Sequence, residues 1–286
     1  MISDITLGQF FPGNSLIHRL DPRTKIILAI LFIVAVFLAS NPVSFFALIL
    51  FLAITVALSR ISFSVIFKGI KPIVFVLIFT ALINVFLTKG ESEPLVSFWI
   101  INIYFEGIMR AVFMALRVII LIVGTSTLLT YTTSPISLTD GIESLLKPLK
   151  LFHIPVHLFA MMMTIALRFI PTLIEETEKI MNAQKSRGAD FTSGGLVKRA
   201  KALIPIIIPL FVSSFKRAEE LATAMECRCY RGDKNRTKLI KLSFKARDVL
   251  TFIMFALVIG GIVTLKILPN KVELVGSVLQ FLFYKI

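Results

Sequence analysis

Two short basic segments contain the side chains of this sequence that are best suited to bind a charged partner. They read A-Q-K-S-R-G at 183–188 and A-M-E-C-R-C-Y-R-G at 224–232, with Arg187 and Arg228 in matching positions. Arginine presents a flat fork of N–H donors that fits a carboxylate on another protein. A cation at a helix C-terminus is also favoured by the helix dipole, by ~0.3–1 kcal/mol at an exposed site. We therefore predict two helix ends that bind a partner through charge-assisted hydrogen bonds.

The two segments belong to a pattern that occurs twice, 41 residues apart. In each copy an apolar run broken by proline leads to a charged turn, an alanine and the arginine. The aligned pairs are Glu178 with Glu219 and Ala183 with Ala224, and the prolines are Pro171, Pro205 and Pro209. The pattern indicates an internal repeat, and two equivalent ends would suit a partner with two equivalent halves. Two amphipathic surface helices with solvated charges would show the same spacing, so this alternative stays open.

The composition is typical of a membrane protein. Of 286 residues 56% are hydrophobic and only 17% are charged, whereas a soluble fold must cover its surface with polar groups. The net charge of +14 could indicate nucleic-acid binding. However, the basic residues flank apolar segments, as the positive-inside rule and attraction to anionic lipids predict. We expect the lipid bilayer as a partner, and no nucleic acid.

Five apolar segments are predicted to cross the cell membrane as helices. They are residues 25–40, 43–58, 72–87, 108–131 and 249–265. The first of these helices is predicted to begin at Pro22, with Asp21 as its N-cap. Lysine and arginine are concentrated in alternate loops, which places the N-terminus in the cytoplasm and the C-terminus outside.

The resulting fold class is an all-α polytopic membrane protein with three parts. Residues 1–131 form a bundle of four transmembrane helices, 132–247 a cytoplasmic domain of long helices, and 248–286 the fifth span and a tail. Two apolar runs at 158–167 and 203–212 are only ten residues long. Runs of that length are more often buried or membrane-surface helices than spans, so 132–247 is expected to be cytoplasmic.

Sequence motifs for catalysis, nucleotide binding or metal binding are missing. There is no G-x-x-x-x-G-K-[ST] loop, no G-x-S-x-G and no H-E-x-x-H. Cys227 and Cys229 form a C-x-C without a nearby histidine, and Pro155 separates His153 from His157. We therefore expect a non-catalytic protein without cofactor or metal.

Two arginines inside the fourth predicted span are the remaining candidates for substrate contact. Arg110 lies near the outer end and can reach the interface. Arg117 is deeper and is predicted to brace the bundle by pairing with Asn84 or Asp4. A self-sufficient permease or channel is the alternative function, but it would need polar residues along several spans.

Three segments resemble the transmembrane (T) component of energy-coupling factor transporters, which are ABC-type importers for vitamins and trace metals. The segments are L-D-P-R-T-K at 20–25, S-R-G at 186–188 and M-E-C-R-C-Y-R-G at 225–232. The family pattern favours alanine before each arginine and often glycine after it. Here Ser186 and Cys227 replace the alanines, and Cys229 stands where glycine is common. All three are small residues.

The resemblance implies that Arg187 and Arg228 each enter a groove on one of two ABC-type ATPase subunits. The same helices would serve as coupling helices and hold a small membrane substrate-binding (S) component, a separate chain that selects the vitamin or metal. The flanking coupling motif would be Ser186, Gly188, Glu226, Cys227, Cys229, Tyr230, Arg231 and Gly232. The hinge between the arginine ends and the S-component surface is predicted at Pro171, Pro205 and Pro209.

Overall fold

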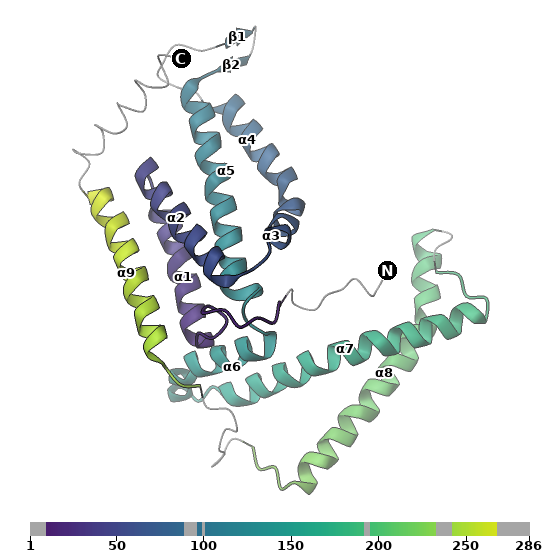
Figure 1. Cartoon of the computed structure of the whole chain (residues 1–286). Coiled ribbons are helices and arrows are strands. Elements are labelled where there is room, and N and C mark those ends of the chain that lie inside the picture. The colour runs from purple at the N-terminus through teal and green to yellow at the C-terminus, as the bar shows by residue number, and fades with distance from the viewer. Residues whose placement is uncertain (1–9, 89–95, 99–100, 192–194, 233–241, 268–286) are drawn as a thin grey trace. The chain divides into compact units, whose positions relative to one another are not determined.

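The computed structural model describes residues 10–88, 96–98, 101–191, 195–232 and 242–267. These residues divide into two compact units (Figure 1). The bundle unit consists of the described parts of residues 8–141 and 242–286, and the arm unit of those of residues 142–241.

The bundle unit is built from helices that follow the apolar segments of the sequence. They are α1 (Pro22–Leu38), α2 (Pro42–Ser59), α3 (Phe63–Ile70), α4 (Val74–Leu87), α5 (Phe105–Thr125) and α9 (Ala246–Ile267). A 3-10 turn η1 (Lys71–Ile73) joins α3 to α4, and a π-helical turn η2 (Ser126–Thr130) extends α5. A short antiparallel hairpin of β1 (Val96–Phe98) and β2 (Ile101–Ile103) lies between α4 and α5. The fold class is nevertheless all-α, as predicted.

Helix α1 begins as the sequence predicts. Pro22 is its first residue, and the Asp21 carboxylate accepts a hydrogen bond from the Arg23 amide at 3.0 Å. The Asp21 amide donates in turn to Oδ1 of Asp248 in the first turn of α9, at 2.9 Å. The cap therefore also joins α1 to α9.

Lys25 is buried in the same region and connects α1 to the chain that follows η2. Its Nζ donates to the Thr132 carbonyl at 2.8 Å, to Thr133 Oγ1 at 3.1 Å and to the His18 carbonyl at 3.3 Å. A buried ammonium is stable only with several such acceptors. The L-D-P-R-T-K segment thus has a structural role inside the bundle unit.

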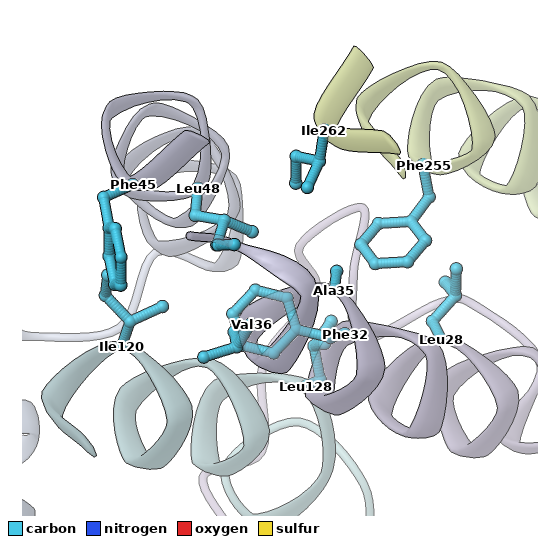
Figure 2. Packing of buried hydrophobic residues seen from close by; sticks show 11 residues of the cluster. Leu28, Phe32, Ala35, Val36, Phe45, Leu48, Ile120, Leu128, Phe255 and Ile262 are labelled. Atoms are coloured by element: carbon cyan, nitrogen blue, oxygen red, sulfur yellow. The ribbon is translucent and has the colours of Figure 1, made fainter. Parts of the chain in front are cut away.

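The apolar core surrounds α1, which packs against α5, η2 and α9 (Figure 2). The buried cluster consists of Leu28, Phe32, Ala35, Val36, Ala39, Phe45, Leu48, Ile120, Leu128, Phe255 and Ile262. Gly124 of α5 faces Phe32, and a Cβ at this glycine would overlap the phenyl ring. The close approach of α1 and α5 therefore depends on glycine at this position.

The outward faces of the bundle unit are apolar. Helix α4 has no buried residue, and its Phe75 and Phe79 are 78% and 57% exposed. Such a surface is stable against acyl chains rather than water. The segments Pro42–Ser59, Phe63–Leu87, Phe105–Thr130 and Ala246–Lys266 are long and apolar enough to cross a membrane. The chain is therefore an all-α polytopic membrane protein.

A fifth segment of this kind, Val156–Ser186, belongs to the arm unit. The number of candidate spans thus equals the number predicted, but the two sets differ. Helix α1, predicted as the first span, has 17 residues and is shorter than all five. The assignment of α1 to the membrane and of residues 132–247 to the cytoplasm stays a prediction.

The arm unit consists mainly of two long helices. After α6 (Pro135–Leu145), which crosses the boundary between the units, and η3 (Lys147–Phe152) come α7 (Val156–Ser186) and α8 (Leu196–Cys227). With 31 and 32 residues, α7 and α8 are each about 45–50 Å long. They pack against each other and cross (Figure 1).

Arg117 of α5 connects α5 to α1 through a partner that the sequence did not predict. Its Nη2 donates to the Ala39 carbonyl at 2.9 Å, and its guanidinium lies 5.5 Å from the centre of the Phe45 ring. Ala39 is the C-cap of α1, where carbonyls lack partners within the helix. The predicted partner Asn84 bonds within its own helix instead, and Asp4 lies outside the described residues.

Candidate functional site

The C-terminal end of α7 is a Schellman motif with an arginine at its cap. Arg187 is the C-cap, and Gly188 follows with a φ of +86°. The Gly188 amide donates to the Lys185 carbonyl at 2.9 Å, and the Ala189 amide to the Gln184 carbonyl at 3.0 Å. These two hydrogen bonds satisfy carbonyls of the last turn and stop the helix.

The end of α8 has the same motif. Arg228 is the C-cap, and Cys229 follows with a φ of +56°. The Cys229 amide donates to the Glu226 carbonyl at 2.8 Å, and the Tyr230 amide to the Met225 carbonyl at 3.0 Å. The sequence repeat is therefore also a structural repeat, with each arginine at the same position of the same motif.

Both arginine side chains are exposed. Neither Arg187 nor Arg228 makes a side-chain hydrogen bond or an ion pair with another residue in the described part of the chain. Each guanidinium is consequently available to a carboxylate or carbonyl on another protein.

The flanking residues divide into an exposed set and one that contacts α7. Ser186, Glu226, Cys227 and Arg231 are exposed. Tyr230 is half-buried, and its hydroxyl donates to Sδ of Met161 on α7 at 3.3 Å. Tyr230 therefore attaches the end of α8 to α7, whereas the exposed residues border the arginine. The second glycine of the segment, Gly232, has a φ of +78°.

A polar contact that the sequence did not predict joins α7 and α8 where they cross. Nη2 of Arg217 on α8 lies 2.8 Å from Oε2 of Glu176 on α7, and the Ser213 hydroxyl donates to Oε1 of the same carboxylate. Because Tyr230 contacts Met161 while Arg217 contacts Glu176, the two helices run antiparallel.

Glu176 and Arg217 are equivalent positions of the sequence repeat, since they are 41 residues apart, as are Arg187 and Arg228. Each arginine end lies 11 residues beyond its member of the pair, or about 16 Å along the helix. The two ends therefore lie on opposite sides of the crossing. When the two copies of the repeat are aligned, Glu176 of the first copy matches Arg217 of the second. That these two side chains form an ion pair is seen only in the structure, where α7 and α8 cross.

The three prolines lie inside continuous helices, Pro171 in α7 and Pro205 and Pro209 in α8. All three are exposed and precede the crossing residues Glu176 and Ser213 along their helices. Each proline is thus on the opposite side of the crossing from the arginine end of its own helix. Their role as a hinge stays a prediction.

The described residues contain no group of three or more His, Cys, Asp or Glu side chains that could hold a metal ion. Cys227 and Cys229 are exposed free thiols. His157 Nδ1 lies 3.1 Å from Oε1 of Glu143, while His153 is exposed.

Comparison with known proteins identifies the family of the chain. The model of the cobalt transport protein (CbiQ) family matches residues 13–239. The chain is 52% identical to the energy-coupling factor transporter transmembrane protein EcfT of Clostridium kluyveri, over 87% of this chain and 92% of that protein. It is 55% identical to the protein of that name from Ruminiclostridium cellulolyticum, with 87% and 92% covered, and 50% identical to that from Bacillus subtilis, with 87% and 93% covered. The chain therefore belongs to the family of energy-coupling factor transporter transmembrane proteins.

Proposed function

We propose that this subunit links ATP hydrolysis by two ABC-type ATPase subunits to the uptake of a vitamin or trace metal. The substrate would be held by a small membrane S component, and nucleotide would bind only to the ATPases. The relatives' names describe a transmembrane protein of an energy-coupling factor transporter, and the family description names transport of cobalt. Both descriptions are consistent with a transport subunit.

The observation that carries this proposal is the matched pair of arginine C-caps. Arg187 and Arg228 are exposed, occupy the same position of the same helix-end motif and lie on opposite sides of one crossing. A partner with two equivalent halves would receive one arginine in each half. A charge-assisted hydrogen bond contributes about 1.5–3 kcal/mol, so two of them would make a large share of a subunit interface.

Helices α7 and α8 can transmit movement because each continues without interruption from the arginine end past the crossing. On the side of the crossing away from its own arginine end, each helix exposes apolar side chains. They include Phe159, Met162 and Met163 on α7 and Ile207 and Phe211 on α8. Methionine and phenylalanine adapt well to apolar partners, so these two patches suit an S component. ATP-driven movement of the ends would thus reach the S component and release its substrate inside.

The proposed topology follows from the same mechanism. ATP is hydrolysed in the cytoplasm, so both arginine ends, and with them residues 132–247, must lie there. The N-terminus is cytoplasmic as well, because Arg19 before α1 and Arg23 in its first turn favour that side.

Removal of the two arginines tests the proposal. Arg187→Ala and Arg228→Ala should each weaken capture of the ATPase subunits and uptake in the reconstituted transporter. The double variant should lose far more than either single variant, because each single variant keeps one arginine end to hold the two-fold partner and the double variant keeps none. Arg199→Ala, an exposed arginine in the first turn of α8, is the control. Normal assembly and uptake in the double variant would exclude this role.

A further inference from the structure

The crossing of α7 and α8 combines a polar contact with an unfilled apolar space. The polar contact is formed by Glu176 with Ser213 and Arg217. Beside it lies a cavity of about 270 Å³, whose lining includes Phe169, Leu173, Ala218 and Ala222 together with Arg217. Arg217 therefore takes part in the polar contact and also lines the cavity next to it.

The polar contact fixes the register of the two helices. The Glu176 side chain is 20% exposed and that of Arg217 is 38% exposed, so the carboxylate has less access to water than the guanidinium that it binds. A shift of either helix by one residue would separate the carboxylate from both of its donors and leave it partly buried and unpaired. The apolar side chains around the neighbouring cavity do not depend on one register, since apolar contacts are not directional.

We propose that Glu176, Ser213 and Arg217 form the pivot of the arm unit. They are positioning residues: they set the angle at which α7 and α8 cross and thereby the separation of Arg187 and Arg228. That the two ends bind ATPase subunits rests on the proposed function. The pivot itself is argued only from contacts within the arm unit.

The lengths of the helices make the ends sensitive to the crossing angle. Each arginine is 11 residues, or about 16 Å, from the pivot. A change of about 10° in the orientation of a helix therefore moves its end by about 3 Å. Closure of the cavity on one side of the pivot provides room for such a change. The ends can then move in a coupled way while the register at Glu176 is kept, and the contact of Tyr230 with Met161 shifts with the end of α8.

The distance between the two ends is the direct test. Because Cys227 and Cys229 are the only cysteines, a cysteine-free background is made by Cys227→Ala with Cys229→Gly. Spin labels are then attached after Ala183→Cys and Ala224→Cys, exposed and equivalent positions of the repeat. Double electron–electron resonance is recorded on the full chain in lipid nanodiscs.

We expect a narrow distance distribution for the parent and a broad one for Glu176→Gln. The charge exchange Glu176→Arg with Arg217→Glu should narrow it again, because the pair is restored. Glu175→Gln, a change of the exposed neighbouring glutamate, is the matched control and should have no effect. An unchanged distribution in Glu176→Gln, or a broad one in the charge exchange, would overturn the proposal.

A substitution that fills the cavity tests movement about the pivot and leaves the pivot residues unchanged. Ala218→Leu places a larger side chain in the cavity, so the shift in label distance on ATP binding to the assembled transporter should become smaller. Uptake per ATP should fall by about two- to thirty-fold, the range found when coupling networks are mutated. A full distance shift together with normal uptake per ATP would show that the cavity is not used.

Failure of the pivot and failure of the proposed function can be told apart. The label distances of the isolated chain report the pivot alone, whereas ATPase capture by the Arg187→Ala and Arg228→Ala double variant reports the function of the ends. If the double variant still captured the ATPase subunits, the pivot would stand and the proposed function of the arginine ends would fail. If the label distances did not change in Glu176→Gln, the pivot would fail and the proposed function of the ends would stand.

Discussion

Gly188 and Cys229 are structural equivalents: each follows an arginine C-cap and has a left-handed backbone, with φ of +86° and +56°. Glycine adopts this conformation without strain, whereas a residue with a Cβ does not. The family pattern often has glycine after the arginine, and the left-handed backbone is a physical reason for that preference.

The first prediction is that Cys229→Gly stabilises the end of α8. Relief of the left-handed conformation should contribute about 1 kcal/mol, which slows amide hydrogen exchange in the last turn by about five-fold. Gly188→Ala should have the opposite effect at α7. A Cβ at Gly188 would meet nothing within 4 Å, so only the backbone cost would be measured. Equal exchange rates in parent and variants would contradict this account.

The second prediction concerns Gly124 in the core of the bundle unit. Gly124→Ala should destabilise the chain by about 1–3 kcal/mol, because the new methyl group overlaps the Phe32 ring. Thermal unfolding in detergent measures the loss, and Phe32→Leu in the same chain should recover part of it. Gly260→Ala on α9, where a Cβ meets nothing within 4 Å, is the control and should stabilise slightly. Similar losses at both glycines would show that helix propensity, not the Phe32 contact, is measured.

The third prediction is that Lys25→Met destabilises the bundle unit by about 1–3 kcal/mol, since the Thr132 carbonyl and the Thr133 hydroxyl lose a buried donor. The unfolding midpoint of the purified chain measures the effect. Arg19→Met removes an exposed cation nearby and should change the midpoint little. A midpoint equal to that of the Arg19 variant would mean that the buried ammonium contributes nothing net.

The fourth prediction tests the topology. In a background without Cys227 and Cys229, Ser40→Cys in the turn between α1 and α2 should react with a membrane-impermeant maleimide in intact cells. Lys198→Cys in the first turn of α8 should react only after the cells are opened. Both positions are exposed, so burial does not explain a difference. Labelling at position 198 in intact cells would show that α7 crosses the membrane.

The fifth prediction concerns the prolines before the crossing. Pro171→Ala and Pro209→Ala restore a backbone donor and remove a ring that crowds the preceding turn, so each helix should straighten. If these prolines transmit movement, uptake per ATP falls in the variants while ATPase binding is kept. Pro42→Ala at the first position of α2, where proline causes no kink, is the control. An unchanged ratio in both variants would leave these prolines with a structural role only.

Local features of this chain were predictable because their causes are local. Asp21 and Pro22 start α1 as expected, since a cap and a fixed φ act over one turn. The apolar composition predicted the membrane class, and the 41-residue repeat located two equivalent arginines. The shared Schellman geometry of their helix ends follows from short-range hydrogen bonds.

The contacts between distant residues were decided by the tertiary structure. Arg217 pairs with Glu176, Lys25 bonds to Thr132 across 107 positions, and Arg117 bonds to a carbonyl of α1 rather than to Asn84. Each of these contacts depends on which faces of two segments meet and at what register. From the sequence alone, many other polar or charged side chains could have formed them. Packing selects among them because a buried ion or carbonyl must be paired, and only the fold brings its partner within reach.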